Sequence, residues 1–598
     1  MSRRRPAIEA LLLAAVATLP LLPFLGSAVS IDAPVFVQVA RQILESPADP
    51  FGFEMVWDPT ASAAARFNRN PPLVSYWLAA WIAVFGERDW VLHLAMLPFP
   101  PLAALAFLGI ARRFTGHALA ASLLLATSPA FLVLGTTVML DLALLACMLG
   151  AVYALVRSEE VGRQAGSRPQ GKQGESARTP GASGWQWLAG VLVAAAGLVK
   201  YVGFSTAPLL AAGALLLLPR PVSALLRVLL PPLLAWGAWG VATAALYGSP
   251  HFLGSTDVVT DRSFEPAEFW NQLVSTPVYY GCALVFPILL WGARLLRAGQ
   301  GAGLALTGLL LGTLAVWWAL PEGEPSRRHP IDAEESVFAV LGFAGAFLLW
   351  GRALRPERWR HGGVEAFLAV WLAGLLVFSA LLNWHVNAAD ALLAAPPVLL
   401  LLFRDPALRP RTRLVAFCVV LTLPLSLLLA TADALQSNFY REAARRIDAE
   451  IGSRPGARWS VGQWGLQHYL AGIGFAAVEP PMYGRSELAV NDWVATARNV
   501  SQMDVDVNLS RFGMRRAWVW EETTWLPLRT TNPDAGAGFY SHHYGYVPFA
   551  WSRAPVEQVQ LGRVMKRLRA PPAAASPGKR ALPEGAPGAG GGPTAEPR

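Results

Sequence analysis

Long apolar runs recur from the N-terminus to about residue 430 of this chain, and they restrict the possible folds more than any other feature. A helix that crosses a bilayer needs roughly 17–25 mostly apolar residues. Because lipid offers no partner for backbone N–H and C=O groups, each long run is predicted to be a helix. About thirteen runs approach or reach this length, near residues 8–28, 89–111, 118–137, 139–156, 185–200, 203–219, 225–247, 275–293, 301–320, 336–351, 363–382, 389–403 and 413–431.

The composition agrees with a chain that lies largely in lipid. Hydrophobic residues make up 54% of the 598 residues and charged residues only 15%, whereas soluble domains carry about 25% charged residues. The net charge of +9 does not indicate nucleic-acid binding, because the arginines fall in short loops instead of forming one basic surface. The three cysteines, Cys147, Cys282 and Cys418, lie inside apolar runs and are expected to be packing residues.

The distribution of arginine predicts the topology. Basic loops favour the cytoplasmic side of a membrane, which places Arg3, Arg4 and Arg5 in the cytoplasm and makes alternate loops basic. Counting the apolar stretch 71–85 as a span would invert every later loop, so we expect it to lie along the outer leaflet. Residues 29–88 then form one long outer loop, and an odd number of spans leaves the C-terminal region outside.

The chain is therefore predicted to be mainly α-helical, a polytopic transmembrane bundle with a small C-terminal soluble domain of the α/β or α+β class. Residues 1–434 are expected to form the membrane part of a cytoplasmic (inner) membrane protein, and residues 435–569 a periplasmic domain. Residues 570–598 are rich in Pro, Gly and Ala and are expected to be disordered. Three further local predictions are a flexible linker at 158–184, a helix at Ser437–Ile451 and strand structure around Arg515–Trp520.

Three ionisable residues stand at the predicted outer ends of spans, where desolvation makes them candidates for function. Asp32 follows the first span and is equally consistent with a helix cap. Asp141 is the only acid in a long apolar region, and Lys200 either snorkels to the interface or binds a lipid phosphate. If the two carboxylates and the cation face one cavity, a carboxylate can act as a general base and the cation can neutralise a phosphate leaving group. Asp32 and Asp141 are also the candidates to hold a divalent metal ion (Mg²⁺, Mn²⁺ or Zn²⁺).

Several short motifs occur in an order that resembles one family. They are Asp32 after the first span, Asn70-Pro-Pro-Leu-Val-Ser-Tyr-Trp77 in the outer loop, Arg112–Gly116 and Ser128–Leu132 before Met139-Leu-Asp141, and Gly197-Leu-Val-Lys200. In this order, over residues 8–430, the chain resembles the GT-C glycosyltransferases, in the branch of the dolichyl-phosphate-mannose–protein mannosyltransferases and the lipid A aminoarabinose transferase. The resemblance implies the GT-C fold, a polyprenyl-phosphate-linked sugar as donor, and Asp32 and Asp141 as the catalytic acids.

The chain also departs from this family's pattern. Ala33 stands where a second acid often follows the first, Asn70 stands where Lys is common, and Ala389-Asp390 stand where relatives commonly carry Arg-Tyr. The candidates for binding the donor phosphate are therefore Lys200, Arg69, Arg66 and His385. The candidates for the loops that meet the acceptor are Asn70, Tyr76 and Tyr201. The segment Phe539–Phe549 resembles one that follows the membrane part in some bacterial relatives.

Three classes of function fit these features. The first is a glycosyltransferase that moves a sugar from polyprenyl phosphate to a protein, lipid A or glycan acceptor outside the membrane. The second is a lipid or solute transporter, although the candidate acids lie at the membrane edge and no inverted repeat is visible. The third is a non-catalytic GT-C-fold protein, which the altered position at Ala389-Asp390 favours and the presence of both Asp32 and Asp141 opposes.

Overall fold

The computed structural model describes residues 4–57, 61–166, 180–254, 266–285, 309–310, 340–342, 362–383, 385–404, 412–478, 488–498 and 514–566. The tail predicted at 570–598 lies outside these residues, as do nearly all of the spans predicted near 301–320 and 336–351.

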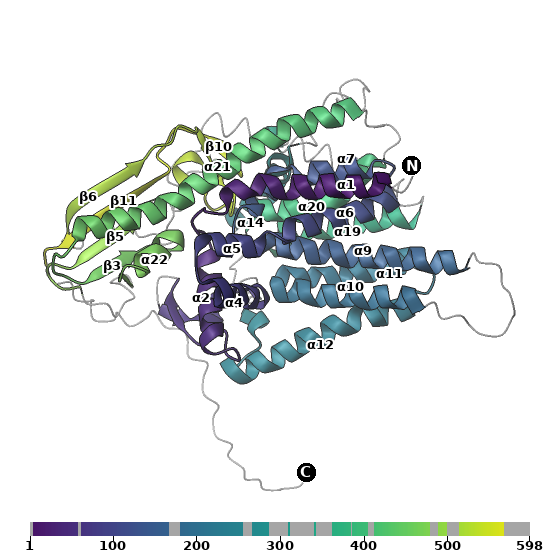
Figure 1. Cartoon of the computed structure of the whole chain (residues 1–598), viewed down its shortest axis with the longest axis horizontal. Helices are drawn as coiled ribbons and strands as arrows, with labels where there is room; N and C mark the ends of the chain where they lie inside the picture. The colour runs from purple at the N-terminus through teal and green to yellow at the C-terminus, as the bar shows by residue number, and fades with distance from the viewer. Residues whose placement is uncertain are drawn as a thin grey trace, which may run out of the picture.

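Seven helical stretches in the described residues are long and apolar enough to cross a membrane. Helix α9 packs on α6 and on α10, and Figure 1 shows most of the long helices running side by side in one bundle. The prediction of a multi-pass membrane protein is therefore confirmed, while the predicted count of about thirteen spans stays a prediction. The seven stretches are α1 (Arg4–Thr18) with η1 (Leu19–Phe24), α5 (Asp89–Met96) with α6 (Phe99–Phe114), α9 (Asp141–Gly166), α10 (Pro180–Val199), α12 (Pro221–Tyr247), α19 (Gly363–Val377) with η3 (Phe378–Leu382), and α21 (Thr412–Ile451).

Two local features differ from the sequence predictions: the stretch predicted as a span near 118–137 is bent and stays a candidate span, and the linker prediction was wrong over residues 158–166. The span predicted at 118–137 is two helices, α7 (Ala118–Ala126) and α8 (Pro129–Gly135), which meet at 55°. Pro129 cannot continue a helix that runs into it, because its ring excludes the helical conformation of the residue before it. Residues 158–166, predicted as part of a flexible linker, continue α9, and Arg163 pairs there with Glu159 one turn earlier at 2.5 Å.

In its described residues, 29–57 and 61–88, the long first loop contains helices and strands but no helix long enough to cross the membrane. It holds α2 (Ala33–Glu45), the strand pair β1 (Glu54–Val56) and β2 (Ala61–Ala63), α3 (Ala64–Phe67) and α4 (Leu73–Phe85). The 13 residues of α4 rise only about 20 Å, less than the hydrocarbon thickness of about 30 Å. Helix α4 packs against α2, so the apolar stretch at 71–85 is a non-spanning helix, as predicted.

Helix α21 joins the membrane part to the C-terminal unit, by which we mean the described residues after α21 (452–566). It has 40 residues, so the helix predicted at Ser437–Ile451 is the end of this long helix. A five-stranded sheet follows, in the order β4-β3-β5-β11-β6, with β3 parallel to β4 and β5, and with β11 antiparallel to β5 and β6. The prediction of a small α/β or α+β region is therefore confirmed. The sheet and its helix are β3 (Arg458–Val461), α22 (Trp464–Ala471), β4 (Ala476–Ala477), β5 (Trp493–Ala497), β6 (Met514–Glu522) and β11 (Glu557–Val564). Two small strand pairs and a short helix lie between β6 and β11: β7 (Leu528–Arg529) with β10 (Ala550–Trp551), β8 (Thr531–Asn532) with β9 (Ala537–Gly538), and η4 (Pro533–Ala535).

Three further helical stretches belong to the bundle. They are η2 (Tyr201–Ser205) with α11 (Thr206–Leu217), α14 (Pro266–Leu284), and α20 (Ala388–Phe403). Every residue of α20 is buried, and α14 and α19 both pack on it. The hydroxyl of Tyr279 on α14 lies 2.6 and 2.8 Å from the carbonyl oxygens of Gly538 and Gly545. These contacts fix the C-terminal unit on the membrane helices.

The substitution Gly545→Ala is expected to destabilise this contact. A Cβ at Gly545 would lie 1.7 Å from the carbonyl oxygen of Gly536, which is backbone and cannot rotate away. We expect a loss of stability of about 1–3 kcal/mol, the usual result of overpacking, measured by thermal unfolding in lipid nanodiscs. Gly116→Ala is the matched control, because nothing lies within 4 Å of its Cβ. Equal melting temperatures for the two variants would contradict the close packing at Gly545.

Candidate active site

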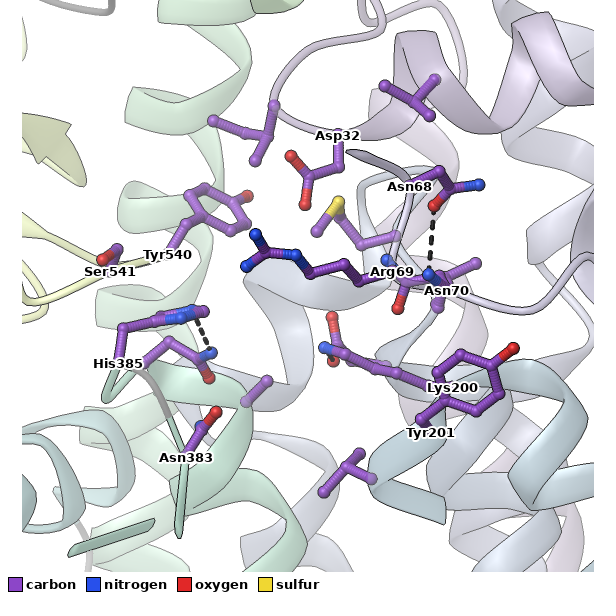
Figure 2. A pocket seen from close by; sticks show the side chains of 18 of the residues that line it. Asp32, Asn68, Arg69, Asn70, Lys200, Tyr201, Asn383, His385, Tyr540 and Ser541 are labelled. Atoms are coloured by element: carbon purple, nitrogen blue, oxygen red, sulfur yellow. Dashed lines mark hydrogen bonds and ion pairs between the residues drawn. The ribbon is translucent and has the colours of Figure 1, made fainter. Parts of the chain in front are cut away.

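A cavity of about 700 Å³ lies between the membrane helices and the C-terminal unit. Asp32, Asp141 and Lys200, which are far apart in the sequence, all line it. Figure 2 shows a close view of it. Of the other predicted site residues, those that line it are Arg69, Asn70, Tyr201 and His385.

Asp141 and Lys200 form an ion pair at one side of this cavity. Asp141 is the first residue of α9, and Lys200 directly follows α10, so packing of these two helices brings the side chains together. The ammonium lies 2.9 Å from Oδ1 of Asp141, with side-chain exposures of 27% for Lys200 and 6% for Asp141. The positive end of the helix dipole also favours a carboxylate at this position. The pair therefore presents one partly accessible cation to the cavity.

Asp32 lies at the start of α2 and lines the same cavity. Its side chain makes no capping hydrogen bond to α2, so the helix-cap interpretation of this residue is not supported. The preceding residue, Ile31, has a φ of 57°, in the left-handed region that a β-branched residue rarely adopts. Such strain costs of order 1–3 kcal/mol and is typical of functional sites.

The pKa of Asp32 is raised to about 6. Burial is the main cause, the charge of Lys200 partly offsets it, and the charge of Asp141 adds to it. A carboxylate with this pKa is ionised at neutral pH and is a stronger base than an exposed aspartate. The side chain therefore suits a general base that faces the cavity.

Arg69 supplies a second cation to the cavity. Figure 2 shows its side chain extended into the cavity, with the guanidinium toward Tyr540. The loop that carries Arg69 is shaped by a turn in which Asn68 Oδ1 accepts a hydrogen bond from the backbone N–H of Asn70 at 3.1 Å. Arg69 and Lys200 are the Arg and Lys side chains in the described lining of the cavity.

The structure does not bring two of the predicted site residues to this cavity. Arg66 lies on the exposed face of the short helix α3. The hydroxyl of Tyr76 donates a hydrogen bond to the carbonyl oxygen of Pro47 at 2.6 Å, and the side chain is 37% exposed on α4. Neither residue lines the cavity. His385 does line it, and its Nε2 lies 3.0 Å from Nδ2 of Asn387.

Tyr201 belongs to a polar chain that the sequence did not reveal. Trp239 Nε1 donates to the Tyr201 hydroxyl at 2.9 Å, so the Tyr201 proton is free to be donated to Nδ1 of His251 at 2.6 Å. Burial lowers the pKa of His251 to about 4, so the ring is neutral at physiological pH. The ring also stacks on Phe51, with centroids 4.4 Å apart, and so joins the turn after Lys200 to the first loop.

The Ala389-Asp390 pair has a structural explanation. Asp390 is the third residue of α20 and forms a capping box, in which Asn387 Oδ1 accepts from the N–H of Asp390 at 3.0 Å and Asp390 Oδ2 accepts from the N–H of Asn387 at 3.3 Å. Asn383 Nδ2 donates to the same carboxylate at 3.0 Å. Ala389 lines the cavity, so the position where relatives commonly carry Arg contributes no charge in this chain.

The described donor set does not fit a tightly held metal ion. No group of three or more His, Cys, Asp or Glu side chains suited to a metal occurs among the residues that the structure describes. Zn²⁺ prefers three or four protein ligands, and Mg²⁺ binds oxygen ligands in octahedral geometry. Of the two candidate carboxylates, Asp141 already has Lys200 as its cation. We therefore derive no step through a metal.

Residues 93–251 match the family model described as dolichyl-phosphate-mannose-protein mannosyltransferase. This range includes Asp141 and Lys200 and excludes Asp32 and Arg69. The resemblance expected from the sequence is confirmed for this part of the chain. No curated protein matches the sequence.

Solved structures show only weak likeness to the chain. ArnT from Cupriavidus metallidurans in the apo state has a TM-score of 0.42 and 14% sequence identity, over 85% of this chain and 95% of that chain. The Archaeoglobus fulgidus oligosaccharyltransferase in the apo form has a TM-score of 0.45 and 14% identity, over 78% of this chain and 64% of that chain. The S. cerevisiae Pmt1-Pmt2 complex has a TM-score of 0.28 and 16% identity, over 41% of this chain and 34% of that chain.

Removing the cation of the buried pair is expected to destabilise the protein. Lys200→Met leaves Asp141 buried beside the cavity with no cation on its Oδ1. Breaking a fully buried pair costs about 3–5 kcal/mol, and we expect about 1–3 kcal/mol because Lys200 is partly exposed. Thermal unfolding in nanodiscs measures this loss, and the double variant Lys200→Met with Asp141→Leu should recover much of it. Arg112→Met is the control, since the Arg112–Glu9 pair is more exposed, and a loss there as large as in Lys200→Met would contradict the assignment.

Asp32→Asn is expected to stabilise the protein at neutral and alkaline pH but not at strongly acidic pH. The pKa of Asp32 is raised in the folded state, so the folded protein binds this proton more tightly than the unfolded chain. Stability linked to this group is fully present below about pH 4 and is lost as the pH rises through about 6. The melting temperature of Asp32→Asn should therefore exceed that of the parent chain at pH 8 and approach it near pH 3, below the pKa of an unfolded aspartate. A difference that is independent of pH would contradict the raised pKa.

Proposed function

We propose that the chain is a membrane glycosyltransferase that moves a glycosyl group from a polyprenyl-phosphate carrier to an acceptor outside the cytoplasmic membrane. The observation that carries this proposal is one cavity lined by the Asp32 carboxylate and by the cations of Lys200 and Arg69. The Asp32 side chain makes no capping hydrogen bond and directly follows Ile31, whose backbone is strained. The family match over residues 93–251 supports it.

Asp32 is proposed to act as the general base. Its carboxylate takes the proton from an acceptor hydroxyl or amine, whose freed electron pair forms the new bond to the anomeric carbon. The bond from that carbon to the phosphate oxygen breaks, and the phosphate leaves with its electron pair. Attack from the side opposite the phosphate inverts the anomeric centre, as the resemblance to the GT-C glycosyltransferases implies.

Lys200 and Arg69 are proposed to bind the donor phosphate. Two cations reduce the energy of the negative charge that the phosphate gains as the bond breaks. The guanidinium of Arg69 can bind two phosphate oxygens at once, whereas Lys200 acts as a point charge. Asp141 holds the Lys200 ammonium at 2.9 Å and so fixes its position. Arg69 thus takes over the role that Arg has in relatives at the position of Ala389.

Part of the cavity lining suits the hydrocarbon chain of the carrier. Its apolar lining includes two well exposed leucines, Leu253 at 44% and Leu382 at 51%, together with Phe204, Phe252 and Phe378. Leu382 ends the membrane-crossing stretch Gly363–Leu382. A lipid tail that enters at this level would bury apolar surface at roughly 25 cal/mol per Å². The charged and apolar parts of the lining together match a lipid phosphate.

The cellular placement of the protein is part of the same proposal. The arginine-rich N-terminus and the alternation of basic loops support an inner-membrane protein with its C-terminal unit in the periplasm. Residues 1–434 would then be the transferase part and residues 435–569 a periplasmic domain. Whether the sugar is a hexose or a pentose, and whether the acceptor is a protein, lipid A or a glycan, is decided by the donor and acceptor panel in the test below.

Donor turnover tests the proposal directly. The chain is reconstituted in lipid with a panel of polyprenyl-phosphate sugars and acceptors, and released polyprenyl phosphate is measured. Asp32→Asn should lower the rate about 10²–10⁴-fold, the usual contribution of a general base. Arg69→Met should lower it roughly 10–100-fold through the lost phosphate contact. Arg66→Met is the matched control, because this nearby arginine does not line the cavity and its loss should leave the rate unchanged.

The opposite results have distinct meanings. Release that is indifferent to both Asp32→Asn and Arg69→Met would place the reaction elsewhere in the chain. No release with any donor would favour a non-catalytic protein, for which the missing charge at Ala389 is the structural argument. Equal rate losses in Arg69→Met and Arg66→Met would show that the loop, and not the Arg69 guanidinium, is what matters.

A further inference from the structure

The C-terminal unit forms part of the wall of the proposed active site. Phe539, Tyr540, Ser541 and Tyr544 all line the cavity. Their segment is bonded to the start of α20 through the backbone, since Ala388 N–H donates to the Phe539 carbonyl at 3.0 Å and His542 N–H donates to the Val386 carbonyl at 2.9 Å. These side chains are therefore held in a fixed position relative to the membrane helices.

Tyr540 is held in one orientation by a buried acid of the long helix α21. Its hydroxyl lies 2.9 Å from Oδ2 of Asp433, and the hydroxyl of Thr530 lies 2.9 Å from Oδ1 of the same carboxylate. Asp433 is only 5% exposed, and within the described residues it has no ion pair. Burying a carboxylate against two hydroxyls costs free energy that an apolar residue would not cost. The arrangement therefore favours a role in orienting Tyr540.

The polarity of this contact determines what Tyr540 can bind. A carboxylate only accepts hydrogen bonds, so the single proton of the Tyr540 hydroxyl is donated to Asp433. The neighbouring Thr137 hydroxyl donates its own proton to the Leu134 carbonyl at 3.0 Å, so the Tyr540 oxygen keeps a lone pair that can accept a hydrogen bond from a group in the cavity. Phosphate oxygens also only accept, so a phosphate is a poor partner, whereas a sugar hydroxyl is a good donor. Tyr540 and Asp32 line the same cavity, where the sugar and the acceptor would meet (Figure 2).

We propose that Tyr540 is a specificity-determining residue that accepts a hydrogen bond from a hydroxyl of the transferred sugar. This inference rests on the proposed function, and it assigns part of the recognition of the glycosyl group to the C-terminal unit. Asp433 is then a positioning residue, which acts through Tyr540 and has no contact with the substrate.

Equilibrium binding to the full chain in nanodiscs tests the inference. The ligands are polyprenyl-phosphate mannose, glucose and aminoarabinose, and polyprenyl phosphate without a sugar. Tyr540→Phe should weaken binding of the preferred glycosylated lipid roughly 5- to 30-fold, as expected for one hydrogen bond in a buried site. Binding of the lipid phosphate alone should not change. Tyr546→Phe is the matched control, because the Tyr546 hydroxyl donates to Asn271 at 2.7 Å in the same segment but does not line the cavity.

A series of deoxy sugars gives a second, independent readout. The parent chain should bind one deoxy donor roughly 5- to 30-fold more weakly than the donor with the complete sugar. For that deoxy donor, the affinities of Tyr540→Phe and of the parent chain should be the same. Equal affinity of the parent chain and Tyr540→Phe for every glycosylated lipid would overturn the inference alone. Equal weakening for lipids with and without a sugar would overturn it too, since it would indicate a structural role. A parent chain that binds no polyprenyl phosphate would overturn the proposed function as well.

Discussion

The ion pair between Asp141 and Lys200 is the interaction on which the rest of the site depends. It joins the first residue of α9 to the residue that directly follows α10, and these two helices pack against each other. Neither charge would be stable alone at the edge of a membrane bundle, because each would lose its hydration without gaining a partner. The pair lies at the same cavity as Asp32, whose pKa is raised to about 6 by burial.

Stability and function oppose each other at Asp32. The strained backbone at Ile31, the absence of a capping bond and the buried charge all lower stability, and an Asn that filled the same space would avoid the charge penalty. Such costs persist where they serve chemistry. The surrounding structure supplies the compensation through α20, whose residues are all buried, and through the close contact of Tyr279 with Gly538 and Gly545.

Hydropathy and charge predicted the class of fold, because lipid tolerates few alternatives to a helix. Desolvation cost also singled out Asp32, Asp141 and Lys200, which do line one cavity. Sequence could not show that they meet, and it assigned Arg66 and Tyr76 without knowing which helix face would point inward. It missed the contacts of Asp433 with Tyr540 and of Tyr201 with His251, since partners 107 and 50 positions apart leave no local pattern. Pro129 alone predicts a break in the helix, but the continuous apolar run around it indicated one straight span, so the 55° bend was not predicted.

The altered position at Ala389 and the Tyr540 contact fit one rearrangement of the site. With Ala389 uncharged and Asp390 used as a helix cap, α20 brings a small apolar residue to the cavity. The negative charge of the phosphate would then be bound by Arg69 and Lys200. Arg69 reaches the cavity from the first loop, and Lys200 reaches it from the position after α10. The wall beside α20 is free for the C-terminal segment, which Ala388 and Val386 hold by backbone hydrogen bonds. A sugar between these two walls would meet cations at its phosphate and a hydrogen-bond acceptor at its hydroxyls. Specificity for the sugar would therefore depend on how the C-terminal unit docks, and variation in that unit would change the sugar without disturbing the phosphate site.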